Sequence, residues 1–457
     1  MNLTIQEILK AVNGQMLHDA EVPRITSIST DTRKITRGAL FVPIVGEIYD
    51  GHDYILAAGE NGAVCALTER ADIPSDIPLI LVDSTRRALM ELAGYYRRIH
   101  NVQVVAITGS AGKTTTKDMI YHILARKYKT KKTLGNFNND IGLPLTIFQL
   151  EPDDEILVLE MGMNHAMEIH ELSKIGAPDV AVITHIGDAH IENFENREGI
   201  LHAKLEIVDG LNPNGTVILN GDDSLLTGPI AAAKVKPFKV QFPGSENIIS
   251  AEPLGGLLAT PSSGLLSGSE CRFIWQGQEI NLTVPLPGSH MVMNALLAVA
   301  VGVKLGVSAE EISKGFDDFI PPSGRLSVEA IKDMVVINDA YNANPAAMME
   351  SIKILCSQPA RKVAILGDMN ELGHASQARH TEIGAFAAEM GIDILIAIGP
   401  QSRYIHEGFG DKCQYFPTVD EFLPQIKQSL QPGDIVLVKA SRGMAFERII
   451  DTLKTED

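Results

Sequence analysis

The stretch that most constrains the fold of this chain lies at residues 104–117, VVAITGSAGKTTTK, where an apolar run meets a glycine-containing turn. The run is rich in β-branched residues and predicts a strand that ends at Thr108. Gly109 and Gly112 let main-chain N–H groups approach an anion closely, and the helix predicted to follow adds the positive end of its dipole. A strand, turn and helix in this order predict an α/β domain that binds phosphate.

The side chains around this turn fit the same chemistry. Lys113 can reach terminal phosphates, and the hydroxyl of Thr114 can bind Mg²⁺. The loop is shorter than the standard phosphate-binding pattern, because it reads G-x-x-G-K-T. A plain strand-to-helix turn with a surface lysine is the alternative, but the order of strand, glycines, lysine and threonine disfavours it. The expected phosphate-binding residues are Gly109, Ser110, Ala111, Gly112, Lys113, Thr114 and Thr115.

Length and charge limit the possible classes of protein. At 457 residues, with 45% apolar residues, the chain is long enough for two to four domains. The net charge of −18 argues against binding to nucleic acid or to an anionic membrane. The first residues lack the pattern of a signal peptide, and no apolar run is long enough to span a membrane. We therefore expect a cytoplasmic protein with no membrane span, and the four scattered cysteines indicate neither a zinc site nor a disulfide framework.

From about residue 102 the sequence alternates between apolar strands and helical segments, which predicts parallel sheets covered by helices. The predicted strands form two series, at 102–108, 155–161, 180–184 and 216–220, and at 334–338, 362–366, 394–398 and 434–438. The predicted helices include 114–128, 167–175, 294–305 and 379–390. Two series of strands indicate two α/β domains, with a break at the proline-containing stretch 319–324.

Two further regions complete the predicted organisation. The first hundred or so residues mix short strands with turns and predict a small separate α/β domain. Residues 240–288 are rich in Gly, Ser and Pro and contain alternating segments, which predict an antiparallel insertion at the edge of the central domain. The expected fold is therefore three α/β domains over 1–97, 98–320 and 321–457. The second would carry the phosphate loop on a parallel sheet, and the third would resemble a Rossmann domain.

Polar residues follow the phosphate loop at places where ligands bind in open sheets. The loop 133–142 carries Asn136 and Asn139, amide donors suited to an anionic substrate, although a plain loop explains them equally well. Glu160 ends the apolar strand ILVLEMG, where a carboxylate beside a phosphate site can bind Mg²⁺. His190 follows the next strand, and a functional role there is about as plausible as a capping role.

Two other residues are ambiguous from the sequence. Lys204 falls on a predicted helix, where residue type alone favours a solvated surface lysine. Asp339 follows the strand MVVIN and could bind ribose hydroxyls, whereas the alternative is a capped turn before the next helix.

Taken in order, the motifs of the whole chain resemble those of the ATP-dependent Mur ligases, which form amide bonds in peptidoglycan synthesis. The motifs are TGSAGKTTTK, TLGNFNNDIG, EMG, Ala189-His190, Ala203-Lys204, HMVMNAL at 290–296, Gly324-Arg325 and DAYNANP at 339–345. The family often has asparagine where this chain has His185. A nucleotide-binding regulator without catalysis is disfavoured, because the residues that the family uses in catalysis are present together.

The resemblance implies roles for single residues. It implies a catalytic set of Lys113, Glu160, His190 and Lys204, with Thr114, Glu160, His190 and Lys204 as ligands of two Mg²⁺ ions and Lys204 carbamylated. It implies that Asn294 contacts adenine, Arg325 an ATP phosphate and Asp339 the ribose, and that Asn136 and Asn139 lie near the acceptor substrate.

Within the family, three features favour the ligases that join D-alanyl-D-alanine to UDP-N-acetylmuramoyl-tripeptide. We also expect the protein to be a monomer. The N-terminal stretch resembles a uridine-nucleotide-binding domain, with Thr32, Arg33, Asp50, Gly51 and His52 at the substrate. DAYNANP, with Tyr341 and Asn342, is one distinguishing motif. The other is GDMNELG at 367–373, where Asp368, Asn370 and Glu371 would bind the incoming amine in place of an Asp-Asn-Pro-Arg motif. The diamino-acid-adding Mur ligase and a folylpolyglutamate synthase are the alternatives.

Overall fold

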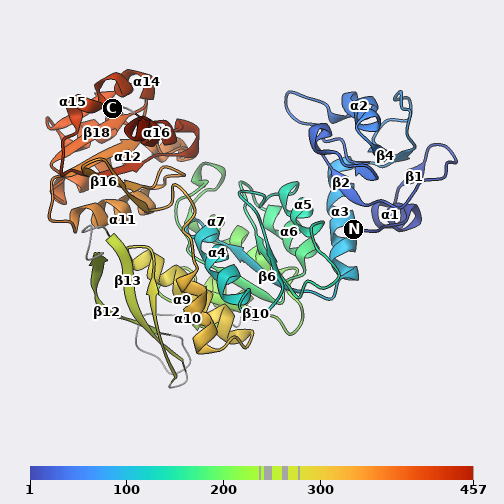
Figure 1. The fold of residues 1–457 in the computed structure, drawn as a ribbon, viewed down its shortest axis with the longest axis horizontal. Coiled ribbons are helices and arrows are strands. Elements are labelled where there is room, and N and C mark those ends of the chain that lie inside the picture. Colours follow the sequence, from blue (N-terminus) through green and yellow to red (C-terminus); the bar gives the residue numbers. More distant parts are fainter. Residues whose placement is uncertain (236–237, 241–249, 260–265, 276–277, 456–457) are drawn as a thin grey trace. The chain divides into compact units, whose positions relative to one another are not determined.

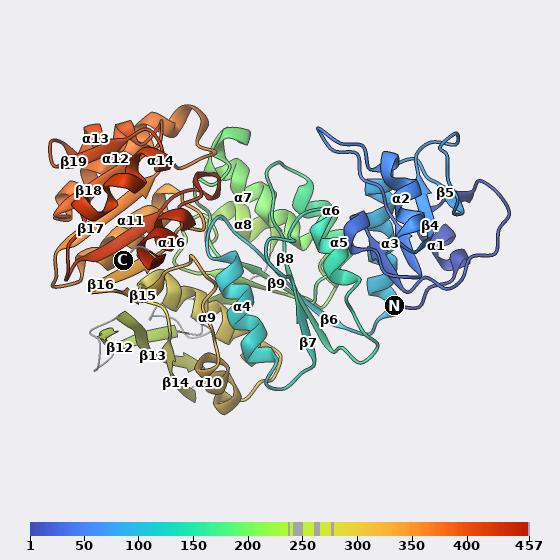
Figure 2. The same ribbon diagram turned by 45° about the horizontal axis from the view of Figure 1, so that its top comes forward.

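The computed structural model describes residues 1–235, 238–240, 250–259, 266–275 and 278–455. Contacts divide the chain into two compact units. The first unit comprises Met1–Thr108, Tyr128–Val182 and Leu205–Val217, and the second comprises Gly109–Lys127, Ile183–Lys204 and Ile218–Asp457. Figure 1 labels the helices and strands, and Figure 2 shows them from a second direction.

The first unit begins with the small α/β domain that the sequence predicts. Its five-stranded sheet has the order β1-β5-β4-β3-β2, in which only β1 is antiparallel to its neighbour. The strands are β1 (Gln15–Met16), β2 (Ser27–Ser29), β3 (Ala39–Phe41), β4 (Ala63–Thr68) and β5 (Leu79–Leu81), and the helices are α1 (Ile5–Val12), α2 (Ile55–Glu60) and α3 (Thr85–Ile99). Helix α1 starts where it does because Thr4 and Glu7 form a capping box.

The central sheet has six strands in the order β11-β10-β9-β6-β8-β7. They are β6 (Gln103–Thr108), β7 (Thr130–Lys132), β8 (Ile156–Glu160), β9 (Val180–Ile183), β10 (Thr216–Asn220) and β11 (Phe238–Val240). Strands β6 and β8 are parallel, with Gln103 opposite Ile156 and Ile107 opposite Glu160. Both are buried along nearly their whole length, which explains why they read as continuous apolar runs.

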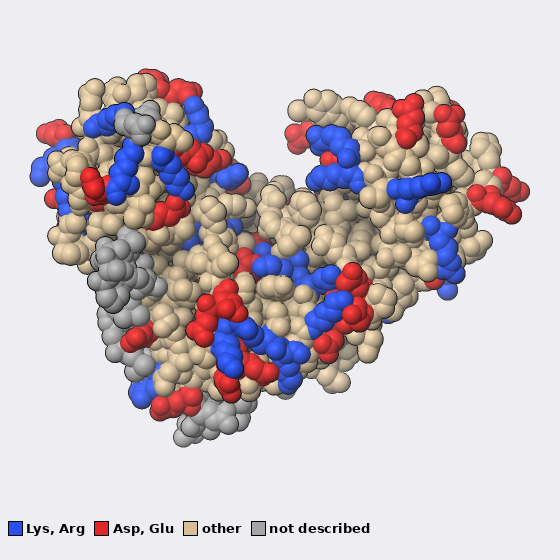
Figure 3. All heavy atoms as spheres, viewed as in Figure 1, with Lys and Arg blue, Asp and Glu red and all other residues tan. Residues whose placement is uncertain are grey.

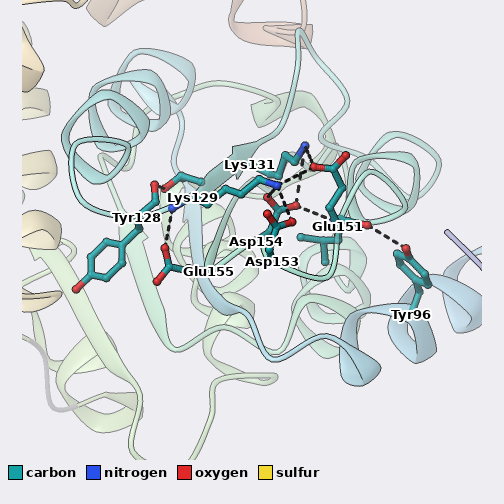
Figure 4. A network of polar contacts seen from close by, with 10 residues as sticks. Tyr96, Tyr128, Lys129, Lys131, Glu151, Asp153, Asp154 and Glu155 are labelled. Atoms are coloured by element: carbon teal, nitrogen blue, oxygen red, sulfur yellow. Dashed lines mark hydrogen bonds and ion pairs between the residues drawn. The ribbon is translucent and has the colours of Figure 1, made fainter.

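An ionic network fixes the edge strand β7 to the turn before β8 (Figure 4). Lys129 lies 3.0 Å from Glu151 and 2.6 Å from Asp153, and Lys131 lies 3.2 Å from Glu151. Nearby, the buried hydroxyl of Tyr96 in α3 donates to the carbonyl oxygen of Leu150. Lysines on an edge strand also discourage pairing with another chain, so the network protects this edge.

The central part of the chain also contains seven described helices. They are α4 (Lys113–Leu124), α5 (Gly142–Ile147), α6 (Glu168–Gly176), α7 (Arg197–Leu205), α8 (Pro229–Lys234), α9 (Ser289–Lys304) and α10 (Ala309–Asp317), with short 3-10 turns η3 (Ile191–Asn193) and η4 (Glu206–Val208). The predicted helix 114–128 ends earlier, at Leu124, because the following residues form tighter i→i−3 hydrogen bonds such as Lys127 to Leu124. The predicted helix 294–305 begins earlier, at Ser289, directly after Gly288.

The predicted antiparallel insertion is confirmed for the described residues. Strands β12 (Ser250–Ala259), β13 (Leu266–Trp275) and β14 (Gln278–Val284) form a three-stranded antiparallel sheet of their own. The remaining parts of the insertion, at 241–249, 260–265 and 276–277, lie outside the described residues.

The C-terminal sheet has the order β15-β16-β20-β17-β18-β19. Its strands are β15 (Ser327–Ile331), β16 (Met334–Asn338), β17 (Lys362–Gly367), β18 (Ile394–Ile398), β19 (Cys413–Phe416) and β20 (Ile435–Lys439), and all are parallel except the edge strand β15. The helices are α11 (Pro345–Cys356), α12 (Ser376–Glu389), α13 (Arg403–Phe409), α14 (Val419–Phe422), α15 (Ile426–Ser429) and α16 (Glu447–Thr455). Apolar residues of α16 pack with the inner strands in one core cluster. All the strands that the two predicted series contain are present, with ends within one residue of those predicted.

The surface is mixed in charge. On the face shown in Figure 3, Lys and Arg side chains lie among Asp and Glu side chains, an arrangement typical of a solvated surface. Among the described residues, no helix combines the length and the hydropathy that crossing a membrane requires.

Candidate functional site

The phosphate loop between β6 and α4 has the geometry that its glycines imply. Gly109 and Gly112 have φ angles of +150° and +82°, which L side chains rarely adopt. A Cβ at Gly109 would lie 1.9 Å from the hydroxyl of Thr184, and one at Gly112 would lie 2.5 Å from Oδ1 of Asn294. Glycine is therefore required at both positions by conformation and by space.

Helix α4 starts directly after this loop, with Lys113 as its first residue. The Lys113 ammonium donates to the carbonyl oxygen of Gly109 at 2.7 Å, so its side chain folds back over the loop. Thr114 lies in the same first turn, whereas Thr115 is buried. Asn294 comes from α9, far along the chain, and its amide lies against Gly112, which brings the predicted adenine contact to the loop.

A second segment, at 184–187 after β9, lines the phosphate loop. The N–H of Ser110 donates to the carbonyl oxygen of His185 at 2.8 Å, and its hydroxyl donates to that of Gly187 at 3.3 Å. The hydroxyl of Thr184 donates to the carbonyl oxygen of Ala111. Of this segment the sequence singled out only His185, as a departure from the family pattern. Its contacts with the phosphate loop were not predicted, because they all involve main-chain carbonyl groups.

His190 and Glu371 are brought together although the sequence predicts different roles for them. Nδ1 of His190 lies 2.7 Å from Oε2 of Glu371, and both residues have left-handed backbone, with φ angles of +63° and +65°. The contact with His190 holds the pKa of the Glu371 carboxyl below its usual range, against the opposing effect of burial. Asp188, two residues before His190, forms an ion pair with Arg379 at 3.0 Å. Left-handed non-glycine residues are frequent at functional sites, which supports a role for both.

Lys204 is buried in α7, with 1% of its surface exposed. The interpretation of Lys204 as a solvated surface lysine is therefore wrong. The pattern of a helix does not show which of its faces other elements cover. For this reason the residue type alone wrongly predicted that Lys204 is exposed. Buried lysines are rare and costly, which makes a chemical role more plausible.

Glu160 lies in the first unit, at the end of β8, and is also buried. Its Oε1 accepts a hydrogen bond of 2.9 Å from the amide of Asn138, and its N–H donates to the hydroxyl of Thr133 at 3.0 Å. Asn138 was not among the predicted site residues. Asn139 instead accepts hydrogen bonds from the N–H groups that begin α5, and Asn136 is exposed.

The C-terminal motif residues cluster around Asp339. Oδ1 of Asp339 accepts from the N–H of Leu326 at 3.2 Å, and Oδ2 accepts from Ser351 at 2.7 Å and pairs with the ammonium of Lys439. That ammonium also donates to the carbonyl oxygen of Asn342 at 3.1 Å. Asp339 is thus fixed by three partners, while the cap of α11 is Asn344.

Arg325 lies over the ring of Tyr341, with its guanidinium carbon 4.0 Å from the ring centroid. Arg442 approaches the same ring at 5.5 Å. These two cations place positive charge beside DAYNANP, where a phosphate contact was predicted, and Arg442 was missed because its partner is remote in sequence.

The two acidic residues of the segment GDMNELG, Asp368 and Glu371, differ in how far they are exposed. Asp368 is 5% exposed, and its carboxylate accepts from the N–H and hydroxyl of Ser402, both at 2.7 Å, and from the N–H of Gln401 at 3.2 Å. Asn370 is held through its N–H by the hydroxyl of Ser441 at 2.8 Å. The side chain of Glu371 is 48% exposed. Glu371 is therefore the acid of this segment that a ligand can reach.

The predicted substrate-binding residues of the N-terminal domain also fall into two groups, those with a structural role and those exposed to a ligand. His52 is buried: its Nδ1 lies 2.7 Å from Asp50, and its Nε2 accepts from the N–H of Glu69 at 3.1 Å. A Cβ on Gly51 would lie 2.5 Å from the main-chain N of Ile44. The turn at Asp50, Gly51 and His52 therefore has a structural role in the local backbone conformation.

Thr32 and Arg33 lie in a short 3-10 turn capped by Asp31. The Arg33 side chain is 87% exposed and pairs with Asp31 at 2.9 Å, which leaves most of its surface open to a ligand. Among all the residues that the structure describes, no three His, Cys, Asp or Glu side chains gather as a metal cluster would.

Comparison with known proteins gives the class of this fold and site. Three family models match the chain: "Mur ligase family, catalytic domain" over residues 24–97, "Mur ligase middle domain" over 107–302 and "Mur ligase, glutamate ligase domain" over 324–442. The chain belongs to the Mur ligase family, and the predicted three-domain α/β architecture is confirmed.

Particular members are similar over their full length. The UDP-N-acetylmuramoyl-tripeptide--D-alanyl-D-alanine ligase of Bacillus subtilis is 36% identical over 98% of each chain. The crystal structure of MurF from Acinetobacter baumannii superposes with a TM-score of 0.92 at 33% identity, covering 100% of this chain and 99% of that one. The MurF ligase of Thermotoga maritima, solved in complex with ADP, has a TM-score of 0.83 at 29% identity, covering 94% of this chain and 97% of that one.

Proposed function

We propose that this chain is an ATP-dependent ligase that joins D-alanyl-D-alanine to UDP-N-acetylmuramoyl-tripeptide, giving the pentapeptide precursor, ADP and phosphate. The phosphate loop, with Lys113 folded over it and Asn294 against it, is the observation that carries the proposal. Full-length similarity to ligases named for these two substrates supports the choice of substrates. We propose that it acts in the cytoplasm, as a monomer.

The reaction runs in two steps. An oxygen of the tripeptide's terminal carboxylate attacks the γ-phosphorus of ATP, and ADP leaves. The neutral amine of D-alanyl-D-alanine then attacks the acyl carbon, and phosphate leaves with the carboxylate oxygen. Lys113 and the N-terminus of α4 would stabilise the negative charge that builds up in the first step.

Mg²⁺ is suited to the donors present. The hydroxyl of Thr114 and the carboxylate of Glu160 are hard oxygen ligands, and His190 offers a nitrogen. When bound, Mg²⁺ neutralises phosphate charge. Lys204 is buried, which supports a chemical role for its amine, and the family resemblance gives that amine the role of adding CO₂ to become a carbamate. We therefore propose that Lys204 is carbamylated and that two Mg²⁺ ions bind.

The remaining residues would hold the substrates. Asn294, Arg325 and Asp339 would bind ATP, with Tyr341 stacked under Arg325. Asn136, Asn139 and Asn342 would contact the acceptor. The diamino-acid-adding ligase and a folylpolyglutamate synthase are the other members considered, and the absence of an Asp-Asn-Pro-Arg motif at 367–373 disfavours the first.

An oxygen-isotope experiment tests the reaction type. When the terminal carboxylate of the tripeptide carries ¹⁸O, one ¹⁸O atom is expected in the released inorganic phosphate, because that oxygen bonded to phosphorus. Phosphate without ¹⁸O, despite formation of the amide, would contradict an acyl phosphate.

The choice of amine should depend on Glu371. We expect Glu371→Gln to raise the KM for D-alanyl-D-alanine roughly tenfold, because a charged hydrogen bond to the ammonium is lost. Steady-state kinetics with each substrate varied in turn measures this effect.

Asp368→Asn is the matched control for Glu371. Its amide would place a donor against the N–H groups of Gln401 and Ser402, so we expect a lower melting temperature and a nearly normal KM for the amine. A selective rise of that KM in Asp368→Asn, with none in Glu371→Gln, would exclude this assignment.

Arg33 should matter for the UDP-linked acceptor. We expect Arg33→Ala to weaken binding of UDP-N-acetylmuramoyl-tripeptide roughly tenfold by calorimetry, because a pyrophosphate loses a charged donor. The melting temperature should hardly change, since the side chain is so exposed. Arg87→Ala, which removes a similarly exposed arginine paired with Glu91, is the control and should leave binding intact. Equal affinities of the Arg33 and Arg87 variants would place the acceptor elsewhere.

A further inference from the structure

Asp223 is a buried carboxylate whose oxygens are both occupied. It follows β10, and its Oδ1 accepts from the N–H of Leu225 at 3.0 Å. Its Oδ2 accepts from the N–H of Ile186 at 2.8 Å and lies 2.8 Å from Nδ1 of His185. Asp223 therefore ties the turn after β10 to the segment 184–187 after β9.

That segment is the one that lines the phosphate loop. His185 accepts from Ser110 through its carbonyl oxygen at 2.8 Å, while its side chain is held by Asp223. Gly187 accepts from the Ser110 hydroxyl. Asp223 is thus connected to the loop through its contacts with residues 185 and 186, the main chain of 185–187, and the hydrogen bonds from Ser110.

The charge of Asp223 strengthens this path. Burial would raise the pKa of its carboxyl, but the hydrogen bonds from His185 and from the N–H of Ile186 outweigh burial and hold the pKa below its usual range. An ionised acceptor makes stronger hydrogen bonds than a neutral one. Because the N–H and the hydroxyl of Ser110 both donate to this segment, a shift of the segment would also move the loop at Ser110.

We propose that Asp223, acting through His185 and Ile186, is a positioning residue that keeps the phosphate loop in its nucleotide-binding shape. The inference rests on the proposed binding of ATP and extends it to Asp223 and His185, neither of which the family resemblance gave a role.

Calorimetric titration of the full-length protein with MgADP tests the proposal without any need for turnover. Asp223→Asn turns an acceptor toward the Ile186 N–H into a donor, so we expect roughly tenfold weaker binding. His185→Ala removes the side-chain hydrogen bond and should also weaken binding several-fold. His185→Asn places an N–H donor at the same distance from Cβ as Nδ1 and should restore an affinity within about twofold of the original.

A matched His–Asp pair provides the control. His170 in α6 lies 2.9 Å from Asp209, in the first unit, and His170→Ala should leave the affinity for MgADP unchanged. Wild-type affinity in folded Asp223→Asn or His185→Ala would overturn the inference, as would failure of His185→Asn to restore binding. If Asp223→Asn does not fold, the two His185 variants decide the question. Absence of MgADP binding by the unmodified protein would overturn the proposed function as well, so the two failures are distinguishable.

Discussion

Lys113→Ala is expected to reduce the amine-dependent turnover of ATP by roughly a thousandfold, because one preorganised cation beside the transferred phosphate contributes on that order. The side chain lies at the start of α4 and folds over the loop toward Gly109. Since it is not part of the apolar core, the melting temperature should stay close to that of the unmodified protein. A coupled assay for ADP release measures the effect.

Lys314→Ala is a suitable control for Lys113. This exposed lysine in α10 pairs with Glu310 one helical turn away and should be dispensable for turnover. Near-normal turnover in the Lys113 variant would show that the loop does not bind the transferred phosphate. Equal losses in both variants would point to a nonspecific effect of charge.

Lys204→Ala is expected to be nearly inactive, and short-chain carboxylates such as formate or acetate should restore part of the activity. The proposed carbamate is an oxygen donor, and a small carboxylate can occupy the space left by the buried side chain. Activity measured against carboxylate concentration, at constant ionic strength, gives the rescue curve.

Lys204→Met separates chemistry from packing. Methionine fills much of the lysine volume without the nitrogen, so this variant should stay folded, remain inactive and show less rescue than Lys204→Ala. A ¹³C carbamate signal after equilibration with labelled bicarbonate should appear in the unmodified protein and vanish in both variants. An active Lys204→Ala variant would refute the carbamate, and so would a ¹³C signal that persists in both variants.

The strands and the phosphate loop could be predicted because their causes are local. The apolar runs of β6 and β8 are buried on both faces, and Gly109 and Gly112 stand where other residues would clash. The helix ends were less accurate, since α4 ends through tighter turns that the sequence pattern does not show.

The environment of each candidate could not be predicted, because it is set by residues far apart in the sequence. The burial of Lys204 depends on what covers α7, and the pairing of His190 with Glu371 joins two loops of different domains. Likewise, only the structure shows that the Asp368 carboxylate accepts hydrogen bonds from Ser402, whereas the Glu371 side chain stays accessible.

Phosphate release with UDP-N-acetylmuramoyl-tripeptide, ATP and one amine at a time measures most directly which two substrates the protein joins. D-alanyl-D-alanine should support rapid release and give a product whose mass equals the sum of tripeptide and dipeptide less one water. Lysine, diaminopimelate and glutamate should give only background release. Rapid release with diaminopimelate or glutamate, and none with D-alanyl-D-alanine, would contradict the proposed function.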